Sequence, residues 1–179
     1  MNKKTILAIC GSTKESSTNL SLINAIAELF KEECNIIIFK DIDRIPHFNP
    51  DLDIEFPPQA VAEFRHLLHA ADAVLICTPE YAMGVPGTLK NAIDWTVSSC
   101  EFSHKPTALI TASSQGQKGH AALMETLKII EADITDETQL VISFVKTKVK
   151  DGKIVDEETL IDVLRVMDVL LQKSLTPNS

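Results

Sequence analysis

The sequence predicts an α/β fold in which helices cover both faces of a parallel sheet. Five short apolar runs alternate with segments whose apolar residues recur at helical spacing. The runs are apolar almost throughout, as is typical of strands buried on both faces, and crossover helices make such strands parallel. The 179 residues are enough for a complete core, so we expect one domain over residues 1–179.

The expected elements follow one another in a regular order. The strands are expected at residues 5–10, 35–39, 73–78, 107–112 and about 139–145. The helices are expected at residues 19–33, 57–70, 87–99, about 120–130 and 156–171. The segment from Lys40 to Pro50 contains two prolines and is expected to be irregular.

Local signals mark where several of these elements begin. Ser17 or Thr18 can cap the first helix, because a side-chain oxygen there accepts a hydrogen bond from the first turn. Pro57 and Pro58 open the second helix, where the N–H group that proline lacks is not needed. Asp151-Gly152 is a turn signal, and the acidic residues shortly after it begin the last helix.

Three loops follow strands at the carboxyl edge of the expected sheet. They are residues 11–19, 79–86 and 113–119. Sheets of this kind bind ligands outside the carboxyl ends of their strands. The three loops are therefore the candidate functional site on topological grounds.

The first loop, Gly11–Asn19, is rich in hydrogen-bond donors. It contains hydroxyl, amide and ammonium groups and leads into a helix N-terminus, a combination that suits a phosphate dianion. Two other nucleotide motifs, G-x-x-x-x-G-K-[ST] and G-x-G-x-x-G, do not match, because residues 13, 16 and 17 are Thr, Ser and Ser. The loop thus favours a lone phosphate, and the alternative is a polar turn with a helix cap.

The second loop, Pro79–Pro86, suits the edge of a flat heterocycle. Prolines stiffen both of its ends, and Gly84 lets the backbone approach a ligand closely. We expect the backbone N–H groups of residues 80–84 to bond the edge of a ring, and Tyr81 or Met83 to lie against its face. The alternative is an ordinary connection in which both side chains are packing residues.

The two loops resemble motifs of the NADPH-dependent FMN reductase family. Residues 11–19 read Gly-Ser-x-Lys-x-x-Ser-x-Asn and resemble its phosphate loop, G-S-x-R-x-x-S-x-N, with Lys14 in place of Arg. Residues 79–95 resemble P-E-Y-N-x-x-x-P-G-x-L-K-N-A-I-D-W, with Ala82 in place of Asn. The resemblance extends from residue 5 to about residue 172. It implies a flavodoxin-like three-layer sandwich with a five-stranded parallel sheet in the order 2-1-3-4-5.

The resemblance implies an FMN-dependent NAD(P)H oxidoreductase, with NADPH or NADH as donor and a quinone, azo, flavin or metal-oxyanion acceptor. It implies no catalytic acid–base side chain, since the cofactor supplies the chemistry, and we expect no metal. The residues that it assigns to FMN border the phosphate and two edges of the ring. They are Ser12, Lys14, Ser17, Thr18 and Asn19 for the phosphate, Pro79, Glu80, Tyr81 and Ala82 for the isoalloxazine, and Ser113, Ser114 and Gly116 for its other edge.

Composition narrows the remaining functional classes. The net charge of −8 argues against a broad nucleic-acid surface. No stretch approaches the ~20 consecutive apolar residues of a membrane span. The short apolar run after Lys3 and Lys4 indicates a strand rather than a signal peptide, so we expect a cytoplasmic protein. The four cysteines lack C-x-x-C spacing, which favours free thiols.

The sequence also raises the question of assembly. Trp95 is expected to lie off the apolar stripe of its helix, which makes it a candidate interface anchor. Because the family commonly forms dimers, we expect a homodimer or homotetramer. Two other functions stay open at this point: an FMN-carrying electron-transfer module, and a non-catalytic binding protein of the same fold.

Overall fold

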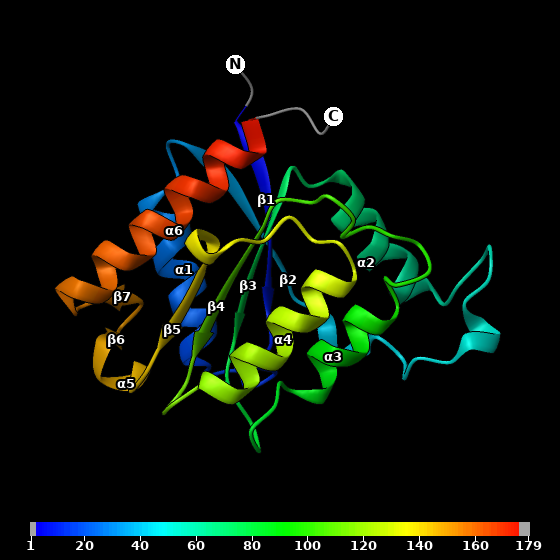
Figure 1. The fold of residues 1–179 in the computed structure, drawn as a ribbon, viewed down its shortest axis with the longest axis horizontal. Helices are drawn as coiled ribbons and strands as arrows, with labels where there is room; N and C mark the ends of the chain where they lie inside the picture. The colour runs from blue at the N-terminus through cyan, green and yellow to red at the C-terminus, as the bar shows by residue number, and fades with distance from the viewer. Residues whose placement is uncertain (1–2, 176–179) are drawn as a thin grey trace.

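The computed structural model describes residues 3–175 and contains a five-stranded parallel sheet in the order β2-β1-β3-β4-β5, as predicted (Figure 1). The strands of this sheet are β1 (Lys4–Cys10), β2 (Cys34–Phe39), β3 (Ala73–Thr78), β4 (Thr107–Ala112) and β5 (Gln139–Ile142). A separate two-stranded hairpin consists of β6 (Val149–Lys150) and β7 (Lys153–Ile154). The first four strands of the main sheet lie close to the ranges that their apolar runs predicted.

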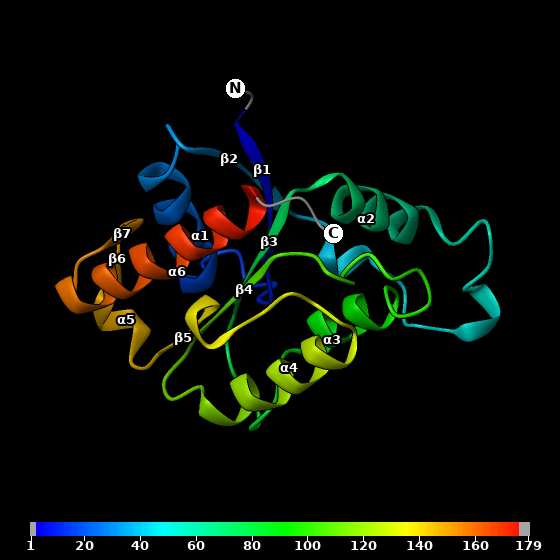
Figure 2. The same cartoon turned by 45° about the horizontal axis from the view of Figure 1, so that its top comes forward.

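Helices cover both faces of the sheet and make the expected three layers (Figures 1 and 2). They are α1 (Thr18–Leu29), α2 (Gln59–Ala70), α3 (Gly87–Asp94), α4 (Gln117–Ile129), α5 (Val145–Lys148) and α6 (Glu157–Leu175). Two core clusters divide the strand residues by alternation. Ile6 and Ala8 pack with α1 and α6, whereas Leu7 and Ile9 pack with α2, α3 and α4. Alternate residues of one strand therefore serve opposite layers, because successive side chains point to opposite faces.

The last third of the chain departs from the predicted boundaries. The expected strand to residue 145 ends at Ile142, and Phe144 then takes a left-handed conformation with φ 54° before the short helix α5. The prediction was wrong there because a run of apolar residues does not itself show where a strand stops. The Asp151-Gly152 turn is confirmed: both residues have positive φ, 49° and 70°, and they close the β6–β7 hairpin.

Trp95 is not an interface anchor. The expected helix over residues 87–99 ends at Asp94, and Trp95 is fully buried in the core on that face of the sheet. Its indole Nε1 donates to the carbonyl oxygen of Pro46 at 2.8 Å, and its ring packs edge-to-face with Phe48, with ring centroids 5.1 Å apart. The side chain that lies off the helical stripe is thus covered by the segment between β2 and α2, which its own helix could not reveal.

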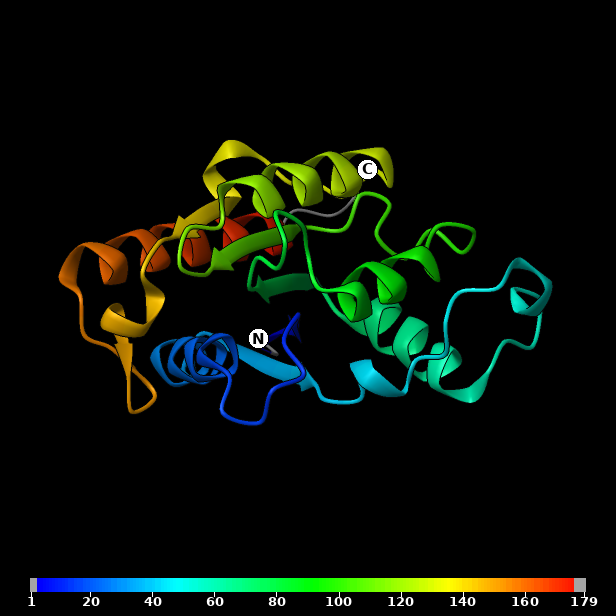
Figure 3. The same cartoon turned by 90° about the horizontal axis from the view of Figure 1, so that it is seen from below.

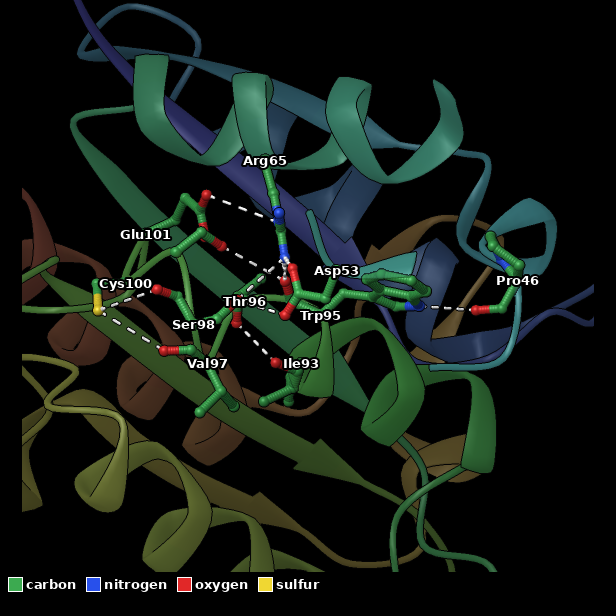
Figure 4. A network of polar contacts seen from close by, with 11 residues as sticks. Pro46, Asp53, Arg65, Ile93, Trp95, Thr96, Val97, Ser98, Cys100 and Glu101 are labelled. Atoms are coloured by element: carbon green, nitrogen blue, oxygen red, sulfur yellow. Dashed lines mark hydrogen bonds and ion pairs between the residues drawn. The ribbon is translucent and has the colours of Figure 1, made fainter. Parts of the chain in front are cut away.

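That segment, residues 40–58, projects beyond α2 and is held by a polar network around Arg65 (Figures 2 and 4). The guanidinium donates to the carbonyl oxygen of Trp95 and lies 2.7 Å from a carboxylate oxygen of Asp53. Hydrogen bonds from Ser98 and Arg65 lower the pKa of Asp53 below its ordinary value. The network ties the projecting segment to the chain that follows α3.

Within residues 3–175, no helix is both long enough and apolar enough to cross a bilayer.

Candidate functional site

The three loops meet at the carboxyl edge of the sheet and border an open cavity of about 590 Å³ (Figure 3 shows this side). Its volume lies within the range of about 300–1,000 Å³ that is usual for small-molecule sites. The lining comes from segments far apart in the sequence. It consists of Ser12, Lys14, Ser16, Ser17, Thr18, Asn19, Pro79, Glu80, Tyr81, Ala112, Ser113, Ser114, Phe144, Val145, Lys146 and Thr147.

Ten of the twelve residues that the resemblance assigned to the site line this cavity. They are Ser12, Lys14, Ser17, Thr18, Asn19, Pro79, Glu80, Tyr81, Ser113 and Ser114. Ala82 and Gly116 are not part of the lining. Both have positive φ, 49° and 97° respectively, so each shapes a loop beside the cavity. Gly116 is also the N-cap residue of α4.

The first loop places its polar side chains around the start of α1. Ser17 is the N-cap, and its hydroxyl oxygen accepts from the backbone N–H of Leu20 at 3.4 Å. Asn19 is buried, and its amide nitrogen donates to the carbonyl oxygen of Ala112 at 3.0 Å. That bond orients the amide and leaves its Oδ1 buried without a hydrogen-bond partner among the described residues. An acceptor in this position calls for a donor from a bound group or water.

Two ammonium groups line the cavity, from Lys14 in the first loop and Lys146 in α5. Neither forms an ion pair within the described part of the chain, whereas Lys148, two residues on, lies 3.8 Å from Asp156. Unpaired cations beside hydroxyl groups and a helix N-terminus favour an anion. The neighbouring thiol of Cys10 does not compete as a nucleophile, because burial raises its pKa.

The second loop is a tight two-residue hairpin. The backbone N–H groups of Tyr81 and Gly84 each donate to the other residue's carbonyl oxygen, both at 2.9 Å. Ala82 and Met83 between them have positive φ, 49° and 63°. The expectation that all N–H groups of residues 80–84 face a ring was therefore wrong for the two that close the turn. Tyr81 and Met83 are 54% and 75% exposed, so neither is a packing residue.

The third loop is fastened to a segment that the sequence did not assign to the site. The backbone N–H of Phe144 donates to Ser114 at 3.3 Å, and that of Val145 donates to Ser113 at 3.2 Å. These bonds bring residues 144–147 to the cavity wall, with Phe144 66% exposed. The overlong strand prediction hid this segment, although it follows a strand at the same edge as the other loops.

Helix α4 is anchored to the sheet beside the cavity through His120. The Nε2 of His120 lies 2.7 Å from Oε1 of Gln139, whose own amide nitrogen donates to Asp136. That orientation makes Gln139 an acceptor, so Nε2 carries the proton and Nδ1 accepts from the hydroxyl of Thr111 at 2.9 Å. His120 is thus a neutral, hydrogen-bonded core residue, and burial lowers its pKa below the ordinary value of 6.5.

This histidine predicts a pH dependence of stability. Because the folded pKa is lowered, the unfolded chain binds more protons in the window from about pH 6.5 down to the folded pKa. The stability contribution is complete above about pH 6.5 and is lost as the pH falls through the folded pKa. The His120→Gln variant should show a flatter free energy of unfolding between about pH 7 and pH 5, by up to about 1.4 kcal/mol per pH unit.

Urea unfolding at a series of pH values measures this slope. The matched control is His66→Gln, because His66 is exposed on α2. A slope that His66→Gln flattens as much as His120→Gln would contradict the assignment to His120.

Comparison with known proteins agrees with this geometry. The family described as NADPH-dependent FMN reductase matches residues 5–146. An NAD(P)H-dependent FMN reductase of Pseudomonas aeruginosa is 35% identical over 161 residues, covering 86% of this chain and 85% of that protein. A 2-hydroxy-1,4-benzoquinone reductase of Burkholderia is 32% identical over 162 residues, covering 86% and 87%. The solved structure of FerB, a flavoenzyme NAD(P)H:(acceptor) oxidoreductase of Paracoccus denitrificans, superposes with a TM-score of 0.84 at 26% identity, covering 96% and 97%.

Proposed function

Because the chain belongs to the NADPH-dependent FMN reductase family, we propose that it uses bound FMN to pass hydride from NADPH or NADH to a small acceptor. Acceptors that fit are quinones, azo compounds, free flavins and metal oxyanions. The observation that carries the proposal is that residues of the first, second and third loops line one and the same cavity. We expect neither a nucleic acid nor a membrane as a binding partner.

The residues of the first loop fit the phosphate and the polyol chain of FMN. The hydroxyl groups of Ser12, Ser16 and Thr18 and the ammonium of Lys14 line the cavity as donors for a dianion. Buried Ser17 serves the anion site mainly by capping α1. The buried acceptor of Asn19 suits a donating hydroxyl of the polyol better than a phosphate oxygen, which is itself an acceptor.

The second and third loops would hold the two edges of the ring. Pro79, Glu80 and Tyr81 supply the wall on one side, and Ser113 and Ser114 supply it on the other. Ala82 and Gly116 contribute through loop shape, since both hold left-handed backbone beside the wall. Lys146 adds a second cation that the family pattern did not identify, and it compensates for Lys14, which cannot form the bidentate contact of an arginine.

The absorbance of the purified protein tests the function directly. We expect a yellow protein, or one that turns yellow on loading with FMN, that NADPH or NADH bleaches rapidly without oxygen. Oxygen or a quinone should restore the colour. Bound FMN that neither nucleotide bleaches would favour an electron-transfer module. A protein that cannot be loaded with FMN would favour a non-catalytic binding protein.

We also propose a cytoplasmic homodimer or homotetramer. All four cysteines are free thiols, as is usual in a reducing compartment, and cell fractionation tests that location. The projecting segment between β2 and α2 carries Leu52, Ile54 and Phe56, which are 44%, 59% and 81% exposed and offer an apolar surface to a second subunit. Sedimentation of a monomer at micromolar concentration would contradict the oligomer.

A further inference from the structure

The carboxylate of Glu80 lines the cavity but is bonded to a different element. Its Oε2 accepts the backbone N–H of Gly119 in α4 at 2.6 Å. Gly119 is the third residue of that helix, and the N–H groups of a first helical turn have no partner within the helix. Glu80 therefore supplies from the second loop the acceptor that an N-cap side chain normally provides.

Helix α4 has no side-chain cap of its own. The residue at its N-cap position is Gly116, which has no side chain and takes φ 97°. A carboxylate at a helix N-terminus also interacts favourably with the helix dipole. The bond from Gly119 to Glu80 consequently stabilises both the start of α4 and the position of the second loop.

The backbones of the two elements also touch, with no spare room. A Cβ added at Gly119 would lie 2.8 Å from the carbonyl oxygen of Gly84 and 3.2 Å from Cγ of Glu80. Glu80 and Gly84, at either end of the second loop's turn, thus both lie against Gly119 of α4. Such external support matters here, because Ala82 and Met83 hold a left-handed backbone that is unfavourable for residues with a Cβ.

The N-terminal turn of α4, which supports the second loop, is itself bonded to the sheet. His120, next to Gly119, is bonded to Thr111 in β4 and to Gln139 at the start of β5. A continuous set of contacts therefore runs from the sheet through α4 to the second loop.

We propose that Glu80 is a positioning residue for the flavin ring. Its hydrogen bond to Gly119 holds the second loop in the position in which that loop contacts the ring. The carboxylate is not itself a ring ligand. This inference rests on the proposed function. It predicts that the bond acts on the ring half of FMN and not on the phosphate half.

The test uses four variants and two flavins. Glu80→Ala removes the acceptor, Glu80→Gln keeps an acceptor without the charge, and Gly119→Ala inserts a methyl group between α4 and the loop. Glu125→Ala is the matched control, since it removes a carboxylate from the exposed face of the same helix. Flavin-fluorescence titration gives the Kd for FMN and for riboflavin, which lacks the phosphate. Hydrogen exchange without flavin follows the amides of Gly119 and Gly84.

We expect Glu80→Ala and Gly119→Ala to weaken FMN and riboflavin binding by the same factor, about tenfold, as the loss of a charge-assisted hydrogen bond predicts. Glu80→Gln should recover most of that loss, and Glu125→Ala should change neither Kd. Exchange at Gly119 and Gly84 should accelerate in Glu80→Ala, and the visible spectrum of its bound flavin should shift. Glu80→Gln and Gly119→Ala keep the test valid should Glu80→Ala not fold.

Two results would overturn the proposal: unchanged affinity for both flavins in Glu80→Ala, or an equal loss in Glu80→Gln and Glu80→Ala. The second, together with wild-type exchange at Gly119 in Glu80→Gln, would mean that the charge acts on the ring directly rather than through α4. A wild-type protein that binds neither flavin would instead contradict the proposed function, and the exchange of Gly119 would still show whether the bond to Glu80 forms.

Discussion

Ser16→Asp should weaken FMN binding about a hundredfold or more while leaving riboflavin binding nearly unchanged. Ser16 is exposed, lines the cavity and precedes the N-cap of α1. A carboxylate there would face a phosphate dianion inside one site, where repulsion between like charges is worth several kcal/mol. Riboflavin has no phosphate, so its affinity isolates that repulsion from any disturbance of the loop.

The matched control is Asn24→Asp, which adds the same charge to an exposed position within α1, away from the cavity lining. Its FMN affinity should stay within about threefold of wild type, because exposed charges at a distance are screened by salt. Equal losses of riboflavin and FMN in Ser16→Asp would show that the first loop does not hold the phosphate. Titration by flavin-fluorescence quenching measures these affinities in the two variants and in the wild type.

Gly11→Ala should lower the free energy of unfolding by about 3 kcal/mol, among the larger effects of a single added methyl group. Gly11 follows β1, and its backbone N–H donates to the carbonyl oxygen of Cys77 at 2.9 Å. An added Cβ would lie 2.2 Å from Oγ1 and 2.7 Å from Cβ of Thr78, which is fully buried. The strand ends would have to separate where the first and second loops begin.

Gly87→Ala is the matched control for this prediction. Gly87 begins α3, and a Cβ there would meet nothing within 4 Å. That variant should be as stable as wild type or more stable, by up to about 1 kcal/mol, because alanine has less conformational freedom in the unfolded chain. In urea unfolding, the double variant Gly11→Ala/Thr78→Gly should lose less stability than the sum of its two single variants. Simple additivity would contradict the contact.

The sequence could predict the sheet and the three loops of the site because both depend on local pattern, and the resemblance to the family then assigned residues within those loops. Apolar runs identified the strands of the main sheet, and strand ends placed three loops at one edge. The role of Glu80 could not be predicted from the sequence, because its hydrogen-bond partner is the backbone N–H of Gly119, which lies 39 positions away. Trp95 was misread for the same reason: the chain that covers it comes from near Pro46. Contacts between distant segments, rather than local propensities, made the difference.

Residues 144–147 show a third kind of failure. Phe144 is exposed and left-handed, although an apolar residue at the end of an apolar run usually continues the strand. The strand ends because the next N–H groups bond Ser114 and Ser113 in place of a neighbouring strand. No local signal distinguishes a strand that continues from one that ends here. Lys146 could therefore be identified as a site residue only from the three-dimensional structure.

The burial of Trp95 makes the protein its own optical reporter. It is the single indole in the chain, it is fully buried in contact with Pro46 and Phe48, and it is not part of the cavity lining. Indole emission overlaps flavin absorption, so a flavin that enters the cavity should dim the emission by resonance energy transfer without moving its wavelength. Denaturation instead exposes the indole to water and shifts the emission to the red. One dye-free measurement can therefore separate loading of the cavity from loss of the fold.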